Sequence, residues 1–154
     1  MTVQIVMGSK SDMRVAEKAI EVLKELGVKH KLSIASAHRT PELVDKLVAE
    51  ADAEVFIAIA GLSAALPGVI AARTTKPVIG VPVSGTLNLD AILSVVQMPP
   101  GIPVAGVGLD RGENAALLAA AILALKDERV AKALAAYRQK LKEKVVKESK
   151  EVEV

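Results

Sequence analysis

The chain alternates short apolar runs with longer segments in which apolar residues recur every three or four positions. The apolar runs predict strands at residues 3–7, 31–35, 55–60, 78–81 and 103–107. The longer segments predict helices at residues 11–26, 41–51, 66–73, 89–96, 113–125 and 128–146. The pattern therefore predicts an α/β protein in which strands and helices alternate.

Such alternation implies βαβ crossovers and a parallel sheet. We expect a three-layer, doubly wound, flavodoxin-like fold of about five strands, followed by an extra C-terminal helix. The chain has 154 residues, which suits a single catalytic domain spanning residues 1–154. The C-terminal helix is predicted at residues 128–146, and the charged tail at residues 147–154 is expected to fray.

The predicted helix at residues 113–125 is apolar nearly all round and reads ENAALLAAAILAL. A helix without a polar face must be buried on every side. A small domain cannot easily bury such a helix alone, so we expect it to pack against another subunit.

Composition narrows the range of functions. The chain has one Phe, one Tyr and no Trp, and its net charge is only +2, which disfavours nucleic-acid binding. The absence of cysteine excludes disulfides, a thiol nucleophile and cysteine-based zinc sites. The sequence shows neither a secretory signal pattern nor an apolar run of the roughly 20 residues that span a membrane, so we expect a cytoplasmic protein.

The loop after the first predicted strand is a candidate anion site, because ligands of open α/β sheets bind at the carboxyl ends of strands. A glycine there allows close approach, and the following helix directs free N–H groups at an anion. Hydroxyl groups and a carboxylate could contact a phosphate or ribose. The candidate residues are Gly8, Ser9, Ser11 and Asp12. An ordinary helix cap is an equally good explanation of this loop alone.

The loop after the second predicted strand carries Ser36, His38 and Arg39. The imidazole of His38 can exchange a proton near neutral pH, because the reference pKa of histidine is roughly 6.5. The guanidinium of Arg39 can bind a phosphate through two parallel hydrogen bonds. The alternative is a loop histidine beside a surface arginine.

Two further loops were assessed for ligand binding. Ala60 and Gly61 begin a loop of small residues after the third strand, which suits a narrow pocket walled by backbone. A plain tight turn between strand and helix would have the same kind of sequence. Residues 106–112 hint at the GxGxxG pattern but fail at its last position and lie late in the chain, so we reject a dinucleotide site there.

Taken together, these loops resemble the PurE family of carboxyaminoimidazole ribonucleotide mutases, in its class I, archaeal and thermophile type. The resemblance runs through most of the chain. It rests on MGSKSD (7–12), SAHRTP (36–41), AGLSAALPG (60–68), KPVIGVPV (76–83), SVVQMPPGIPVAGVG (94–108) and ENAALLAAAILAL (113–125).

The resemblance implies an enzyme of purine synthesis that converts N-carboxyaminoimidazole ribonucleotide to carboxyaminoimidazole ribonucleotide by decarboxylation and recarboxylation. It implies a homo-octamer without metal or cofactor, acting on a ribonucleotide and carbon dioxide. His38 would be the catalytic proton carrier, and Ser9, Asp12 and Arg39 would bind the ribose phosphate. Other residues would line the same site, namely Gly8, Ser11, Ser36, Ala60 and Gly61.

The sequence departs from the family pattern in two places. Ala65 stands where the family's third loop, commonly AGGAAHLPG, has a histidine, and residues 84–94 are a residue or two shorter than usual. A related branch carboxylates aminoimidazole ribonucleotide directly with carbon dioxide and usually carries Lys after the loop histidine. Arg39 favours the mutase, while Ala65 keeps the direct carboxylase open.

Two functions outside this chemistry were also weighed. A non-catalytic ligand-binding module of flavodoxin-like fold would bind tightly without turnover. A flavin-binding electron carrier is disfavoured because the chain has almost no aromatic side chains to stack on the flavin ring.

Overall fold

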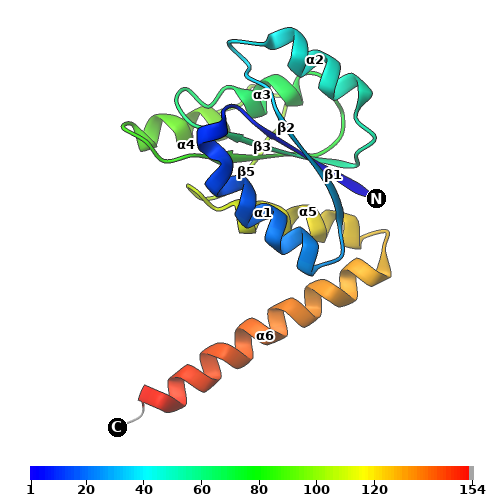
Figure 1. Cartoon of the computed structure of the whole chain (residues 1–154), viewed down its shortest axis with the longest axis vertical. Coiled ribbons are helices and arrows are strands. Elements are labelled where there is room, and N and C mark those ends of the chain that lie inside the picture. Colours follow the sequence, from blue (N-terminus) through cyan, green and yellow to red (C-terminus); the bar gives the residue numbers. More distant parts are fainter. Residues whose placement is uncertain (153–154) are drawn as a thin grey trace.

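The computed structural model describes residues 1–152 and contains one five-stranded sheet with all strand pairs parallel (Figure 1). The strand order is β2-β1-β3-β4-β5. The strands are β1 (Thr2–Met7), β2 (Lys29–Ile34), β3 (Val55–Ala60), β4 (Val78–Pro82) and β5 (Ala105–Gly106). Strand β2 lies on one side of β1, and β3, β4 and β5 follow on the other side, so the chain changes the direction in which it adds strands. This is the arrangement of a doubly wound fold, and the predicted fold class is confirmed.

Helices cover both faces of the sheet, which gives three layers (Figure 1). One face carries α1 (Met13–Glu25) and α5 (Gly112–Ala124). The other face carries α2 (Pro41–Glu50), α3 (Leu66–Ala71) and α4 (Asn88–Val96). A short 3-10 turn, η1 (Lys10–Asp12), precedes α1, so the α-helix begins two residues later than the predicted helix at residue 11.

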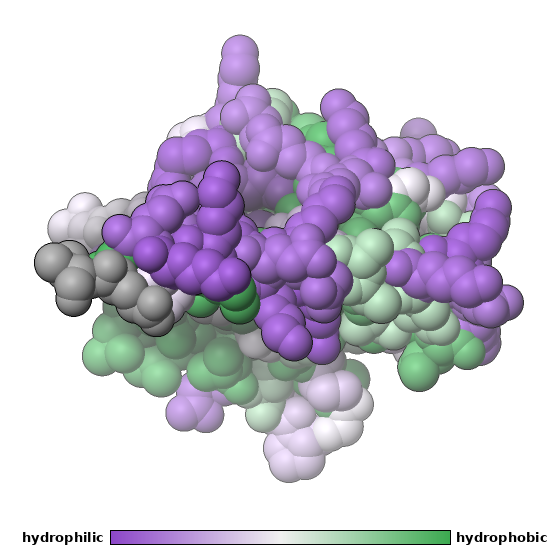
Figure 2. Space-filling view, turned by 90° about the horizontal axis from the view of Figure 1, so that it is seen from below, coloured by the Kyte–Doolittle hydropathy of each residue, from purple (hydrophilic) through white to green (hydrophobic). Residues whose placement is uncertain are grey.

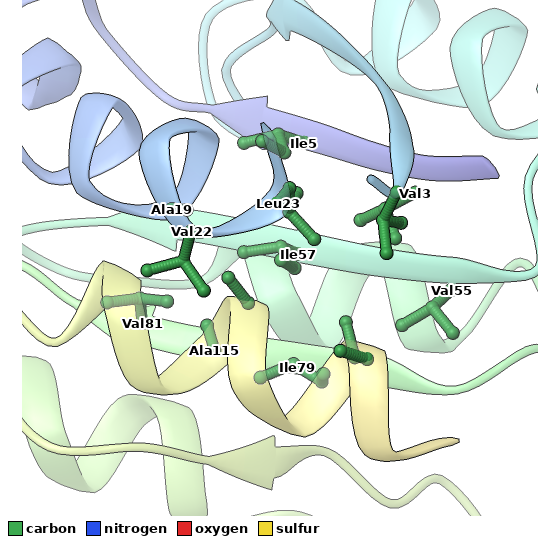
Figure 3. Packing of buried hydrophobic residues seen from close by; sticks show 14 of the residues in the cluster. Val3, Ile5, Ala19, Val22, Leu23, Val55, Ile57, Ile79, Val81 and Ala115 are labelled. Carbon is green, nitrogen blue, oxygen red and sulfur yellow. The ribbon is translucent and has the colours of Figure 1, made fainter. Parts of the chain in front are cut away.

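The core has two parts, one on each face of the sheet, because successive side chains of the central strands point to opposite faces. Ile5, Ile57 and Ile79 are fully buried and lie between the sheet and the helix pair α1 and α5 (Figure 3). Phe56 and Ala58 point to the opposite face, where they pack with α2, α3 and α4. Because β3 is buried on both faces, its six residues are all apolar, as is typical of a parallel strand.

The apolar helix α5 is covered largely within its own chain. Its buried side lies on the sheet and α1, and α6 (Glu128–Val152) packs beside it through Val130 and Leu134. Beyond this contact α6 extends away from the sheet (Figure 1). Burial of α5 therefore has an intramolecular source, and its contact with another subunit stays a prediction.

The C-terminal helix is longer than predicted. It continues to Val152 rather than ending at residue 146, so the predicted helix end is wrong and residues 147–152 are helical, while the fraying of this end stays a prediction. Lys and Glu are good helix formers, and Lys144 pairs with Glu148 one turn away at 3.8 Å. Residues 153–154 of the predicted tail lie outside the described residues.

The last strand is shorter than predicted. Only Ala105 and Gly106 pair with β4, opposite Ile79 and Gly80, whereas the apolar run predicted residues 103–107. Pro103 has no N–H to donate to a neighbouring strand. The strand lies at the edge of the sheet, where both paired residues are exposed.

The molecular surface seen from below is mostly hydrophilic, with hydrophobic areas at the lower left and at the right of the view (Figure 2). Within residues 1–152, no helix combines the length and apolar character needed to span a membrane.

Candidate active site

Three loops that follow neighbouring strands line one cavity of about 180 Å³ at the carboxyl edge of the sheet. They follow β1, β2 and β3, which lie side by side in the order β2-β1-β3. Every residue assigned to the site from the sequence lines this cavity, namely Gly8, Ser9, Ser11, Asp12, Ser36, His38, Arg39, Ala60 and Gly61. The structure thus brings together residues up to 53 positions apart, counted from Gly8 to Gly61.

The first loop is held by a reciprocal capping arrangement around η1. The Ser9 hydroxyl accepts a hydrogen bond from Ser11 N (3.4 Å), and the backbone N–H of Ser9 donates to Asp12 Oδ2 (3.0 Å). Ser11 Oγ also donates to Asp12 Oδ1 (3.4 Å). The cap suggested by the sequence and the candidate ligand site are therefore the same structure, because capping is what orients these side chains.

Asp12 is the buried carboxyl group of the cavity, with only 7% of its surface exposed. Burial raises the pKa of Asp12 above its ordinary value of 3.8, against hydrogen bonds from Ser9 and Ser11 and the charge of Arg39, which lower it. A partly desolvated carboxylate of this kind is well suited to accept hydrogen bonds from sugar hydroxyl groups.

The second loop joins the first through Arg39. Nη2 of Arg39 donates to the carbonyl oxygen of Gly8 (2.9 Å), and Nε donates to Ser36 Oγ (3.2 Å). The guanidinium is exposed toward solvent and carries five N–H donors, so donors are left for a ligand. This geometry places a fixed positive charge at the cavity rim.

His38 lies on the exposed turn of the second loop and lines the cavity. The other histidine, His30, is engaged elsewhere, since its Nδ1 donates to the carbonyl oxygen of Val28 (3.0 Å) outside this cavity. An exposed imidazole at the edge of a polar pocket is free to exchange protons with a bound ligand.

The third loop contributes more of the wall than the sequence indicated. Leu62 and Ser63 are exposed and line the cavity, although neither was assigned to the site. The backbone turns tightly here, with Ala64 N–H donating to the carbonyl oxygen of Gly61 and Ala64 in the left-handed region (φ 46°). Nothing in the composition of this loop signals a non-glycine residue at positive φ, so the direction of Leu62 and Ser63 was not predictable.

A polar cluster lies beside the third loop, at the end of β4. Asp110 accepts hydrogen bonds from Ser84 N (3.0 Å) and the Ser84 hydroxyl, and it pairs with Arg14 at 3.1 Å. Burial pushes the pKa of Asp110 upward, but the Ser84 hydrogen bonds and the Arg14 guanidinium outweigh it and hold the pKa below 3.8. The cluster ties the start of α1 to the loop before α5, which contains the incomplete GxGxxG pattern at residues 106–112.

A larger hollow of about 940 Å³ lies near the opposite end of β4, where Val78 and Ala105 are among its lining residues. Neither a histidine nor a carboxylate is among those residues, and open α/β sheets bind ligands at the other edge. The smaller cavity is therefore the candidate active site.

A parallel α/β sheet with polar loops and an exposed histidine around a cavity at its carboxyl edge is typical of small-molecule enzymes of the doubly wound class. The family model described as AIR carboxylase matches residues 2–144, and the chain belongs to that family.

Named relatives agree with this assignment. The chain is 66% identical over 142 residues to N5-carboxyaminoimidazole ribonucleotide mutase of Methanocaldococcus jannaschii, covering 92% of this chain and 90% of the relative. It is 48% identical to the mutase of Pyrococcus horikoshii, covering 98% and 88%. Among solved structures, Treponema denticola PurE matches with a TM-score of 0.91 at 34% identity over 99% of both chains. The resemblance drawn from the sequence motifs is confirmed.

Proposed function

We propose that this enzyme converts N5-carboxyaminoimidazole ribonucleotide to carboxyaminoimidazole ribonucleotide in purine biosynthesis, with His38 as the proton carrier. The mutases to which the chain is similar support the reaction. The observation that carries the site is the convergence of His38, Arg39 and Asp12 on one cavity.

We propose that the phosphate, the ribose and the base of the substrate each contact a different part of the cavity. Arg39 contacts the phosphate, because its guanidinium presents positive charge and further N–H donors to the cavity. Asp12 accepts hydrogen bonds from the ribose hydroxyl groups, and the Ser9 hydroxyl accepts from them or donates to them. Ala60 and Gly61 present backbone to the base, as their small side chains leave room for a flat ring.

The chemistry then needs two proton transfers, one from His38 to the substrate and one from the substrate back to His38. The carbamate C–N bond breaks, its electron pair returns to nitrogen, and carbon dioxide is released as protonated His38 gives its proton to that nitrogen. The ring carbon of the freed aminoimidazole attacks carbon dioxide held beside it and forms the new C–C bond. Neutral His38 then takes the proton from that ring carbon, so the enzyme ends in its starting protonation state.

Direct carboxylation of aminoimidazole ribonucleotide is the second candidate function. It is kept because Ala65 lines the cavity at the position where the family pattern has a second histidine. The test supplies purified protein with the carbamate alone, or with aminoimidazole ribonucleotide and bicarbonate. Efficient conversion of the carbamate is the expected result. Conversion only of the second mixture would make the chain a direct carboxylase, and no conversion of either would favour a ligand-binding module.

The active enzyme in this proposal is a cytoplasmic homo-octamer with sites at subunit junctions. A cavity of about 180 Å³ is smaller than the roughly 300 to 1,000 Å³ of a typical ligand pocket, which supports completion of the site by a second copy. Light scattering of the purified protein is expected to give the mass of eight chains, and a monomer would contradict the assembly.

A further inference from the structure

The hydroxyl of Thr40 is used in an unusual way. Thr40 occupies the N-cap position of α2, where a Thr hydroxyl ordinarily accepts a hydrogen bond from an N–H of the first helical turn. Its side chain makes no such bond. Thr40 Oγ1 instead accepts from Ser36 N (2.9 Å) and donates to the carbonyl oxygen of Ser36 (3.3 Å).

These bonds close the second loop on itself. The backbone N–H of Thr40 also donates to the carbonyl oxygen of Ser36 (2.9 Å), so three hydrogen bonds join the two ends of the loop. Between these ends lie only Ala37, His38 and Arg39. Ser36 Oγ in turn accepts from Arg39 N (3.3 Å) and Nε (3.2 Å).

This arrangement leaves helix α2 without a side-chain cap at its N-terminus, which makes the helix less stable. Pro41 at the first helical position partly offsets the loss, because it has no N–H to satisfy and its φ is already helical. The hydroxyl that would stabilise α2 therefore stabilises the turn that carries His38 and Arg39.

We propose that Thr40 is a positioning residue of the active site, which acts by holding His38 and Arg39 in place through Ser36. The proposal rests on the roles proposed for those two residues. Misplacement of a reacting group by about 1 Å can lower a rate by about 100-fold, so release of the clamp has a measurable effect.

The experiment compares Thr40→Val, which keeps the shape of the side chain and removes both hydrogen bonds, with Thr40→Ser, which keeps the hydroxyl. Thr74→Val is the matched control, because Thr74 Oγ1 accepts from Lys76 N (3.1 Å) in a loop outside the cavity. Steady-state kinetics with the carbamate and thermal melting are measured for each, with His38→Asn in the same series. Thr40→Ala replaces Thr40→Val if the latter does not fold.

Thr40→Val is expected to lower kcat/KM by about 10- to 100-fold, through a lower kcat and a higher KM together, at an unchanged melting temperature. Thr40→Ser and Thr74→Val are expected to stay near the wild type. Wild-type kinetics of folded Thr40→Val, or equal loss in Thr40→Ser, would overturn the proposal. Impaired Thr40→Val beside fully active His38→Asn would support the clamp and contradict the role of His38 instead.

Discussion

Arg39 reaches from the second loop to the first, where its Nη2 donates a hydrogen bond to the carbonyl oxygen of Gly8 over 2.9 Å. The same guanidinium donates through Nε to Ser36. One planar group thus bridges the loops that follow β1 and β2 and keeps its remaining donors for a ligand. The cavity depends on this bridge for its shape as well as for its charge.

Arg39→Lys is expected to raise KM by about 10-fold or more with a smaller change in kcat, because an ammonium cannot bridge both loops and also bind a phosphate with two parallel bonds. Steady-state kinetics with the carbamate measure this. Arg73→Lys is the control, since Arg73 pairs with Asp45 outside the cavity. An unchanged KM for Arg39→Lys would remove Arg39 from phosphate binding.

Asp12→Asn separates the contribution of Asp12 to binding from its contribution to stability. Because the pKa of Asp12 is raised in the folded protein, the native state binds more protons than the unfolded state as the pH rises from 3.8 through the folded pKa. The wild type therefore loses stability across that window, whereas the Asn variant does not. The melting temperature of the variant relative to the wild type is expected to rise with pH over this range.

Whereas Asp12→Asn is expected to gain stability relative to the wild type as the pH rises, it is expected to bind the substrate more weakly. Loss of a hydrogen bond to a charged group costs about 1.5–3 kcal/mol, so Asp12→Asn is expected to raise the substrate Kd by about 10-fold or more at neutral pH. Melting curves and ligand titration on the same samples check both effects. A melting difference that falls with pH, or an unchanged Kd, would contradict the account of Asp12.

Gly112 marks the closest approach of α1 and α5. A Cβ at this position would lie 2.1 Å from the carbonyl oxygen of Val15, so the two helices must separate to admit it. Gly112→Ala is expected to cost about 1–3 kcal/mol of unfolding free energy, as overpacked sites do. Gly85→Ala is the control because no atom lies within 4 Å of its Cβ position. Equal stability of both variants in chemical denaturation would contradict this packing.

Most of the fold was predictable because the central strands β3 and β4, which are buried throughout, are unbroken apolar runs in the sequence. β3 begins and ends at the predicted residues, and its burial on both faces explains why. β5 was overestimated because residues 103–107 lie at the edge of the sheet, where only Ala105 and Gly106 pair with β4, so an apolar run there does not mark the length of a strand. The end of α6 was missed because a charged segment can be a solvated helix as well as a tail.

The residues lining the candidate site could be predicted where they come directly after a strand, and could not be predicted where their position depends on a turn. His38 and Arg39 could be assigned because a parallel sheet brings the ends of neighbouring strands to one edge. Leu62 and Ser63 could not, since they lie in a tight turn with Ala64 at positive φ that no residue of the loop signals. The role of the Thr40 side chain could not be predicted for a related reason. A Thr before Pro41 indicates a helix cap, whereas in the structure its hydroxyl is hydrogen-bonded to Ser36.

The most direct test of the proposed mechanism is the turnover of His38→Asn with the carbamate substrate, beside His30→Asn as the matched histidine control. Loss of general acid–base catalysis typically lowers kcat by about 10²- to 10⁴-fold, and we expect this loss in His38→Asn with KM and melting temperature close to the wild type. His30→Asn is expected to keep wild-type turnover. A His38→Asn variant with wild-type kcat would contradict the assignment of His38 as the proton carrier.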